Sequence, residues 1–292
     1  MHMSPLALGL WRITNAPSLR PQEVLSLLNT ALDQGISTVD QADIYGDYGS
    51  EALFGQALAL DPALRERLQV VTKCGIKLIS KNRPDHRIKY YDTGRQHIIA
   101  SVENSLQQMQ TDRIDLLLIH RPDPLMDADE VAAAFAELKS AGKVLHFGVS
   151  NFSPQQTALL QSRLDEPLIT NQIEISPLHL DPFTDGSLDY MQTHRIRPMA
   201  WSPLGGGSLF SSESPAINNI KKAGQELMEH YGLQGLDQLI YAWLMRHPAG
   251  IIPVLGTTKS SRIVDAARAT QVQMSRQDWF ALYSAALGNE VP

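Results

Sequence analysis

The stretch IDLLLIH, residues 114–120, is apolar almost throughout and ends on an imidazole. A half-exposed strand alternates apolar and polar residues, whereas a strand of a parallel sheet is covered on both faces and needs no alternation. Similar short runs recur along the chain, with amphipathic segments between them. The predicted strands are Leu6–Leu10, Ile36–Asp40, Leu68–Cys74, Ile114–His120, Val144–Ser150, Leu168–Gln172, Arg197–Ser202 and Ile251–Leu255.

The segments between these runs have helical spacing and recognisable helix ends. Ser153 and Gln156 predict a capping box before one helix, and Thr93 and Gln96 have the spacing for the same motif before another. A last helix is expected over residues 275–288, and we predict that it lies over the barrel. Strand and helix therefore alternate from one end of the chain to the other.

Alternating strands and helices favour a closed (β/α)8 TIM barrel with long loops at the C-terminal face and a C-terminal helix. We interpret residues 1–292 as a single barrel domain, since no low-complexity linker divides them. An open doubly wound sheet is the alternative. That fold usually has G-x-G-x-x-G after its first strand, and here the sequence reads LGLWRITN instead.

Composition excludes several classes of protein. Apolar residues make up 43% and charged residues 19%, and the formal net charge is -6, so a nucleic-acid partner is not expected. The single cysteine, Cys74, cannot form an internal disulfide, which indicates a reducing compartment and a cytoplasmic location. No apolar run approaches the ~20 residues of a membrane span. We read the opening MHMSPLALGLW as a first strand and not as a signal peptide, and we expect no metal site.

Reactive groups in such barrels lie at the carboxyl ends of the strands, and four candidates stand there: Asp40, Tyr45, Lys73 and His120. Taken singly, each is better explained as a turn former, a packing residue or a solvated charge. Taken together they suit proton transfer. A buried lysine needs a counter-charge, which Asp40 would supply, and an ammonium beside a phenol lowers the phenol pKa. A neutral imidazole could hold a carbonyl oxygen.

In this order these four residues look like the tetrad of the aldo-keto reductase superfamily. The segments TVDQADIYG, LLLIHRPDP, GKVLHFGVSNF and NQIEISPL resemble its signatures, and the chain as a whole is most similar to bacterial NADP-dependent oxidoreductases. The resemblance implies reduction of aldehydes or ketones by NADPH. Tyr45 would be the general acid, Lys73 and Asp40 would tune it, and His120 would orient the carbonyl.

The resemblance also implies a binding site for NADP(H). Trp201 would stack on the nicotinamide, the glycine loop after it would cover the pyrophosphate, and the segment after the eighth strand would bind the 2′-phosphate. The implied cofactor-binding residues are Trp11, Ser150, Asn151, Gln172, Trp201, Ser202, Pro203, Leu204, Gly205, Gly206, Gly207, Gly256, Thr257, Thr258, Lys259 and Arg262. Trp11 is also expected to line the substrate pocket, together with Ile44 and Tyr48.

The sequence departs from the family pattern in three places. Asp265 and Ala266 replace a Glu-Asn pair that often grips the adenine, and Trp201 is larger than the usual tyrosine or phenylalanine. The chain starts almost directly at its first strand, so the N-terminal hairpin that plugs most of these barrels is expected to be short or absent.

Other functions remain open at this level. Lys73 could form a Schiff base with a carbonyl substrate, or the protein could be a slow redox sensor that binds nicotinamide. The basic insertion at residues 77–95 could attract acidic substrates, although a solvated loop is the simpler interpretation. Cys74 is expected in the core. The expected partner is a small-molecule carbonyl compound, and the protein is expected to be a monomer or a weak homo-oligomer.

Overall fold

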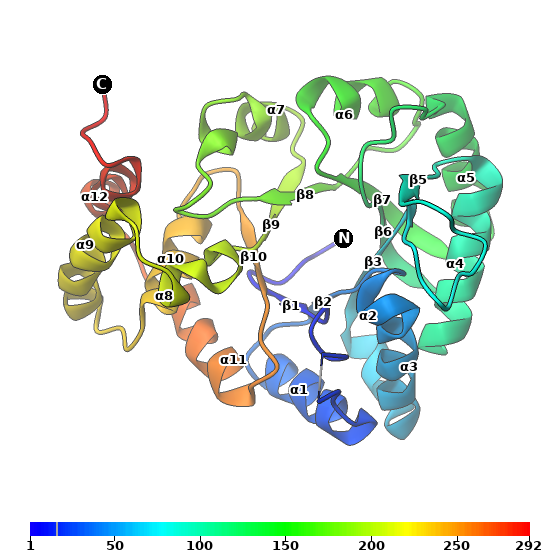
Figure 1. The fold of residues 1–292 in the computed structure, drawn as a ribbon, viewed down its shortest axis with the longest axis horizontal. Helices are drawn as coiled ribbons and strands as arrows, with labels where there is room; N and C mark the ends of the chain where they lie inside the picture. Colours follow the sequence, from blue (N-terminus) through cyan, green and yellow to red (C-terminus); the bar gives the residue numbers. More distant parts are fainter. Residues whose placement is uncertain (16) are drawn as a thin grey trace.

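Eight parallel strands close into a barrel in the computed structural model, which describes residues 1–15 and 17–292 (Figure 1). Around the barrel the order is β1-β10-β9-β8-β7-β6-β3-β2. The strands are β1 (Ala7–Gly9), β2 (Thr38–Asp40), β3 (Gln69–Cys74), β6 (Ile114–Ile119), β7 (Val144–Ser150), β8 (Thr170–Glu174), β9 (Arg197–Trp201) and β10 (Ile252–Leu255). The predicted barrel is confirmed, and the closed sheet rules out the doubly wound alternative.

Helices surround the strands, as Figure 1 shows. They are α1 (Pro21–Asp33), α2 (Tyr45–Tyr48), α3 (Ser50–Leu60), α4 (Arg95–Met109), α5 (Ala128–Ser140), α6 (Pro154–Gln161), α7 (Ser187–Thr193), α8 (Ser208–Ser211), α9 (Pro215–Tyr231), α10 (Leu236–Met245), α11 (Ser260–Ala267) and α12 (Arg276–Leu287). The capping box of Ser153 and Gln156 is confirmed at α6. The one expected at α4 is wrong, because Gly94 is the N-cap and the Thr93 hydroxyl donates to Asp123 instead (2.9 Å).

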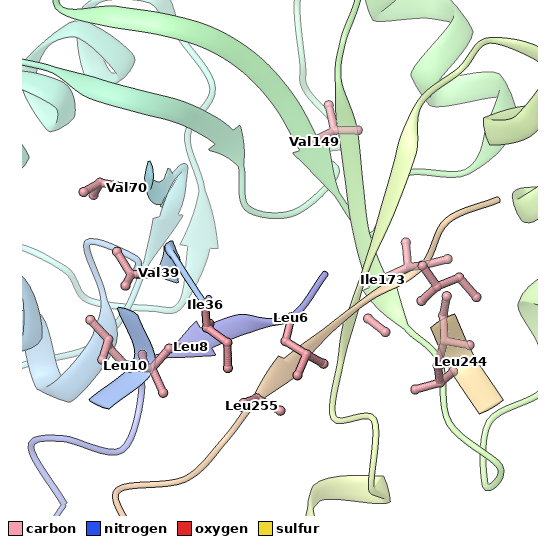
Figure 2. Packing of buried hydrophobic residues seen from close by; sticks show 14 of the residues in the cluster. Leu6, Leu8, Leu10, Ile36, Val39, Val70, Val149, Ile173, Leu244 and Leu255 are labelled. Carbon is pink, nitrogen blue, oxygen red and sulfur yellow. The ribbon is translucent and has the colours of Figure 1, made fainter. Parts of the chain in front are cut away.

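The strands are buried on both faces, which explains their unbroken apolar runs. Side chains that point into the barrel form one cluster: Met3, Ala7, Val71, Leu116, Leu118, Met199, Ile252 and Val254. The alternate side chains point outward and pack with buried residues of the helices in a second cluster, of which Leu8, Val39 and Val149 are labelled in Figure 2. Cys74 belongs to this outer cluster and is 1% exposed, so its expected place in the core is confirmed. Burial raises the pKa of its thiol well above the usual value.

The segment before β1 packs against the inside of the barrel. Residues 1–6 contain no strand. Met3 is 4% exposed and packs with the inward-facing side chains, and Arg197 Nη1 donates to the Met3 carbonyl (3.1 Å). The Ser4 hydroxyl accepts from the Thr38 backbone amide (3.0 Å) and fixes the segment to β2. Met3 thus adds to the inward-facing cluster from outside the strands.

The insertion after β3 is a short hairpin, not an unstructured loop. It pairs β4 (Ile76–Lys77) with β5 (Tyr90–Tyr91) in antiparallel register. Two contacts fix it to the loop after β2: the Leu78 amide donates to Tyr48 Oη (2.9 Å), and Asn82 Nδ2 donates to the Asp47 carbonyl (2.9 Å).

The last helix forms where it was expected, but its predicted position over the barrel is wrong. Helix α12 packs against α9 at the edge of the molecule (Figure 1). Its Trp279 ring stacks on Trp243 of α10 at a centroid distance of 5.2 Å, and each indole N–H donates to the other residue's carbonyl (3.1 Å in both cases). The sequence pattern predicted the helix, but it carries no information about which element the aromatic side chains of the helix pack against.

A buried carboxyl group joins two helices to the outer side of β3. Glu51, at the start of α3, is 2% exposed and accepts hydrogen bonds from the Thr72 hydroxyl (2.6 Å) and the Ser105 hydroxyl (2.9 Å). Burial, which disfavours the charged form, raises the pKa of Glu51 to about 7. Below that pH the folded protein holds a neutral acid, whereas the unfolded chain is ionised above its ordinary pKa of about 4.3.

The raised pKa makes Glu51 a source of pH-dependent instability. The folded state binds the proton more tightly than the unfolded state does, so this contribution to stability is lost as pH rises through about 7. We predict that Glu51→Gln becomes more stable relative to the wild type by roughly 2 kcal/mol between about pH 5 and about pH 8. Urea denaturation at several pH values measures this. A stability difference that does not change with pH would contradict it.

Candidate active site

The ammonium of Lys73 is the centre of the polar groups in the barrel mouth. The residue is fully buried, and its Nζ donates to three acceptors: Asp40 Oδ2 (2.9 Å), the Gln41 carbonyl (2.8 Å) and Tyr45 Oη (3.0 Å). Asp40 ends β2 and Lys73 lies in the adjacent β3, so neighbouring parallel strands bring the charges together. All three ammonium protons have partners, which a buried charge requires.

The local backbone turns Tyr45 back over Lys73. The amides of Gln41 and Asp43 donate to the carbonyls of Val71 and Lys73 (2.8 and 3.1 Å), which continues the strand pairing past β2. The chain then reverses through left-handed conformations at Gly46 (φ 60), Asp47 (φ 55) and Tyr48 (φ 67).

Glycine is needed at position 46 for two reasons. Its φ of 60 lies in the left-handed region, and an added Cβ would lie 2.1 Å from Thr14 Oγ1. The Tyr-Gly pair therefore allows the loop after β1 to pack closely against the turn. This close approach also brings the Trp11 ring to 6.4 Å from the ring of Tyr45.

The charges of the lysine and the tyrosine follow from burial and from their neighbours. Burial alone would lower the pKa of Lys73, but Asp40 and Tyr45 together raise it above the usual value, so the ammonium is kept. Burial raises the pKa of Tyr45, and Lys73 opposes this increase without cancelling it. The expected net lowering of the tyrosine pKa is therefore wrong for this structure, because loss of water outweighs the adjacent positive charge. Tyr45 is a neutral phenol.

His120 faces the tyrosine at the end of β6. Its backbone amide donates to the Cys74 carbonyl (2.8 Å), and its ring meets the Tyr45 ring edge-on at a centroid distance of 5.9 Å. Burial, followed by the charges of Lys73, Arg121 and Lys89, lowers the pKa of His120 well below its usual value. The imidazole is neutral. Within the described residues its buried Nδ1 has no hydrogen-bond partner.

A chain of polar contacts leads from Asp40 to an indole on β9. Gln172 Nε2 donates to Asp40 Oδ1 (2.7 Å), and the Gln172 carbonyl accepts from the Ser150 hydroxyl (2.8 Å). Asn151 Nδ2 donates to Ser150 Oγ (2.7 Å), while Asn151 Oδ1 accepts from Trp201 Nε1 (2.9 Å). The predicted amide-binding residues and the predicted stacking residue therefore form one hydrogen-bonded group beside the tetrad.

The glycine loop after β9 turns its backbone repeatedly. Ser202, Gly205, Gly206 and Gly207 all have positive φ (49, 60, 66 and 109). A Cβ added at Gly207 would meet nothing within 4 Å, so space is open there. Arg12 Nη2 donates to the Gly206 carbonyl (3.2 Å), linking this loop to the one after β1. Successive turned amides of this kind form concave surfaces for anions.

Two exposed cations follow β10 at the start of α11. Lys259 is the N-cap residue of the helix, its amide donates to Thr257 Oγ1 (3.1 Å), and Arg262 lies in the first turn. No carboxylate pairs with either cation in residues 1–15 and 17–292. Hydroxyl groups and unpaired cations at a helix N-terminus suit a phosphate dianion.

Of the residues expected to line the substrate pocket, Trp11 is exposed at the mouth, whereas Tyr48 contacts the insertion. Trp11 is 57% exposed beside Tyr45, as a pocket residue would be. Tyr48 instead contacts the insertion. Its hydroxyl accepts a hydrogen bond from the Leu78 amide, and the Arg83 guanidinium lies 4.5 Å from its ring centroid. Lys77, one of the basic residues there, contacts His97 Nδ1 (2.9 Å) and pairs with Asp92 (3.7 Å). Arg83 and Lys77 thus have partners within the described structure.

Sequence reasoning missed Arg121. Its Cζ lies 5.7 Å from the centroid of the Trp201 ring, and it contributes to the lowered pKa of His120. In the sequence, the only indication of this role was its position directly after His120.

The structure gives no candidate metal site, since no group of three His, Cys, Asp or Glu side chains in the described residues is arranged to hold an ion. Nor does the described part of the chain contain a helix long and apolar enough to cross a membrane.

Comparison with known proteins gives a consistent result. The model of the Aldo/keto reductase family matches residues 5–286. The chain is 49% identical over 284 residues to an uncharacterized oxidoreductase, YcsN, of Bacillus subtilis, covering 97% of this chain and 94% of the relative. It is 49% identical over 291 residues to a 6-dehydroglucose reductase of Agrobacterium fabrum, covering 100% and 97%. A solved aldo/keto reductase of Klebsiella pneumoniae, in complex with NADP and acetate, matches with a TM-score of 0.76 at 26% identity, covering 96% of this chain and 90% of that one.

The buried pair of Asp40 and Lys73 can be tested by its effect on stability. Removing one partner leaves the other charge buried and uncompensated, so Asp40→Asn or Lys73→Met should each cost about 3–5 kcal/mol. The double variant should recover much of that loss. Chemical denaturation of the four proteins gives the coupling energy. The exposed pair of Arg163 and Asp129 (2.9 Å) is the control, and breaking it should cost about 1 kcal/mol or less.

Proposed function

Since the chain belongs to the aldo/keto reductase family, we propose that this oxidoreductase reduces an aldehyde or ketone to an alcohol with NADPH. One observation carries the proposal. A neutral Tyr45 phenol accepts a hydrogen bond from the buried Lys73 ammonium (3.0 Å), which leaves the phenol proton free for a substrate oxygen. The neutral His120 ring lies on its other side.

The proposed reaction uses the tyrosine as general acid. NADPH, when bound, supplies the hydride for the carbonyl carbon. As negative charge grows on the carbonyl oxygen, Tyr45 gives that oxygen its hydroxyl proton. The phenolate that remains is stabilised by the Lys73 ammonium, which Asp40 keeps charged and in place. His120 is placed to hydrogen-bond the same oxygen and orient the carbonyl.

The chain's own residues fit the cofactor. The face of Trp201 would support the nicotinamide ring, with Ser150, Asn151 and Gln172 as its amide partners. The open, left-handed loop at Gly205–Gly207 would hold the pyrophosphate through backbone amides. Lys259 and Arg262, with no acidic partner in the described residues, would bind the 2′-phosphate and so select NADPH over NADH.

The proposed substrate is the aldehyde group of an oxidised sugar. The support is the relative named 6-dehydroglucose reductase, which is 49% identical and matches 100% of this chain. A second relative with the same name, from Novosphingobium aromaticivorans, is 41% identical over 298 residues.

The Schiff-base alternative is disfavoured by the state of Lys73. An amine must be neutral to attack a carbonyl, whereas here the ammonium is bonded to three acceptors and its pKa is raised. A slow nicotinamide-binding sensor would share all these contacts. Steady-state turnover across a panel of aldehydes and ketones separates the sensor from the enzyme.

The role of the tyrosine is tested by Tyr45→Phe. This change removes the proton donor and keeps the ring, so kcat for carbonyl reduction should fall by about 10²- to 10⁴-fold. The dissociation constant for NADPH should stay within about twofold, because the phenol is not assigned to the cofactor. Stopped-flow reduction and cofactor titration measure the two quantities. A variant that still reduces aldehydes at the wild-type rate would remove Tyr45 from the mechanism.

Cofactor choice is tested at the start of α11. The wild type should bind NADPH at least about tenfold more tightly than NADH, because two charge-assisted contacts depend on the 2′-phosphate. Replacing Lys259 and Arg262 with glutamine should remove the preference by weakening NADPH binding alone. Isothermal titration calorimetry gives both constants, and Arg268→Gln, an exposed arginine just after the same helix, is the control. Equal affinities in the wild type would refute the assignment.

A further inference from the structure

Arg121 reaches across the barrel mouth. It follows His120 at the end of β6, whereas Trp201 ends β9, and β7 and β8 lie between these strands. The Arg121 guanidinium nevertheless lies 5.7 Å from the centroid of the Trp201 ring. The side chain must therefore extend over the ends of the two intervening strands, on the side where Asn151 joins the His120 carbonyl (3.4 Å) to the Trp201 indole (2.9 Å).

The charge of Arg121 is not neutralised by a carboxylate. Throughout residues 1–15 and 17–292, no aspartate or glutamate forms an ion pair with it. Asp40, the acid buried in the mouth, is committed to Lys73. The Arg121 charge acts on two catalytic candidates: after burial and Lys73 it lowers the pKa of His120, and it is a minor influence that lowers the pKa of Tyr45. A guanidinium without an ion-pair partner in the described residues therefore lies beside Trp201, and the nearest acid in the strand register is Glu174, which pairs with Trp201 across β8 and β9.

This charge distinguishes the two redox states of a nicotinamide ring. The oxidised ring carries a positive charge and the reduced ring is neutral, so an unpaired guanidinium nearby repels only the oxidised state. A tryptophan face attracts cations and would by itself favour the oxidised ring. The Arg121 guanidinium lies 5.7 Å from the centroid of the same ring, so its repulsion of the oxidised ring opposes this attraction.

We propose that Arg121 makes the protein bind NADPH more tightly than NADP⁺ and thereby favours carbonyl reduction. The inference rests on the proposed function, because it takes Trp201 as the support for the nicotinamide. Beyond that function, the inference gives Arg121 two effects: it favours carbonyl reduction over alcohol oxidation, and it speeds the release of NADP⁺. By linkage, whatever weakens binding of one redox state changes the equilibrium between the bound states by the same factor.

The test is the ratio of two dissociation constants, measured by isothermal titration calorimetry with NADPH and with NADP⁺. Arg121→Met removes the charge and keeps an apolar side chain of similar length. We expect it to tighten NADP⁺ binding by about five- to tenfold and to change NADPH binding by less than about twofold. Arg121→Lys should keep most of the wild-type ratio, because it keeps the charge. Arg163→Gln, at an arginine paired with Asp129 on the outer surface, should change neither constant.

The dependence of this ratio of dissociation constants on ionic strength is an independent test. Because Arg121 and Trp201 are partly exposed, raising the salt from about 50 mM to about 500 mM should reduce the wild-type ratio, and the ratio of Arg121→Met should change less. An unchanged ratio in Arg121→Met, with a higher KM for the carbonyl substrate, would overturn the inference and make Arg121 a substrate contact. Equal tightening of both cofactors would also overturn it. If the wild type bound neither cofactor, the proposed function would fail together with the inference.

Discussion

The buried ion pair between Lys73 and Asp40 is the interaction on which the mouth of the barrel depends. It places a charge at the inner surface of β3 with no access to water, so every acceptor around it has to be provided by the chain. The loop after β2 supplies the Gln41 carbonyl, and the turn at Gly46 brings Tyr45 back as the third acceptor. The contacts that satisfy the buried charge are therefore the same contacts that position the proposed catalytic groups.

Much of the fold was predictable because buried parallel strands carry a strong signal. Short, mostly apolar runs located all eight strands, and their parallel direction placed the carboxyl ends at one mouth. The same reasoning brought Asp40 near Lys73, since both stand at the carboxyl ends of neighbouring strands: Asp40 pairs with Val71, two residues before Lys73. Cys74 followed from alternation: if Lys73 points inward, the next side chain points out.

The errors came from effects that depend on three-dimensional surroundings. The Tyr45 pKa is set by the balance between burial and the Lys73 charge, and sequence shows the charge but not the amount of water excluded. Thr93 has capping chemistry, yet Asp123 lies close enough to compete for its hydroxyl. Helix α12 was predictable as a helix, but its position depends on the stacking of the Trp279 ring on the Trp243 ring of α10. Arg121 reaches a residue three strands away, which no local pattern reports.

The hairpin of β4 and β5 has a consequence for exchanging loops between related enzymes. Its anchors are Tyr48 and Asp47, which belong to the left-handed turn that follows Tyr45. A non-glycine residue in that conformation costs of order 1 kcal/mol, and the contacts with Leu78 and Asn82 help to hold it. The hairpin and the turn therefore form one transferable module. A graft that moved the hairpin without its two anchor residues would leave the new loop unattached and loosen the turn beside the Tyr45 phenol.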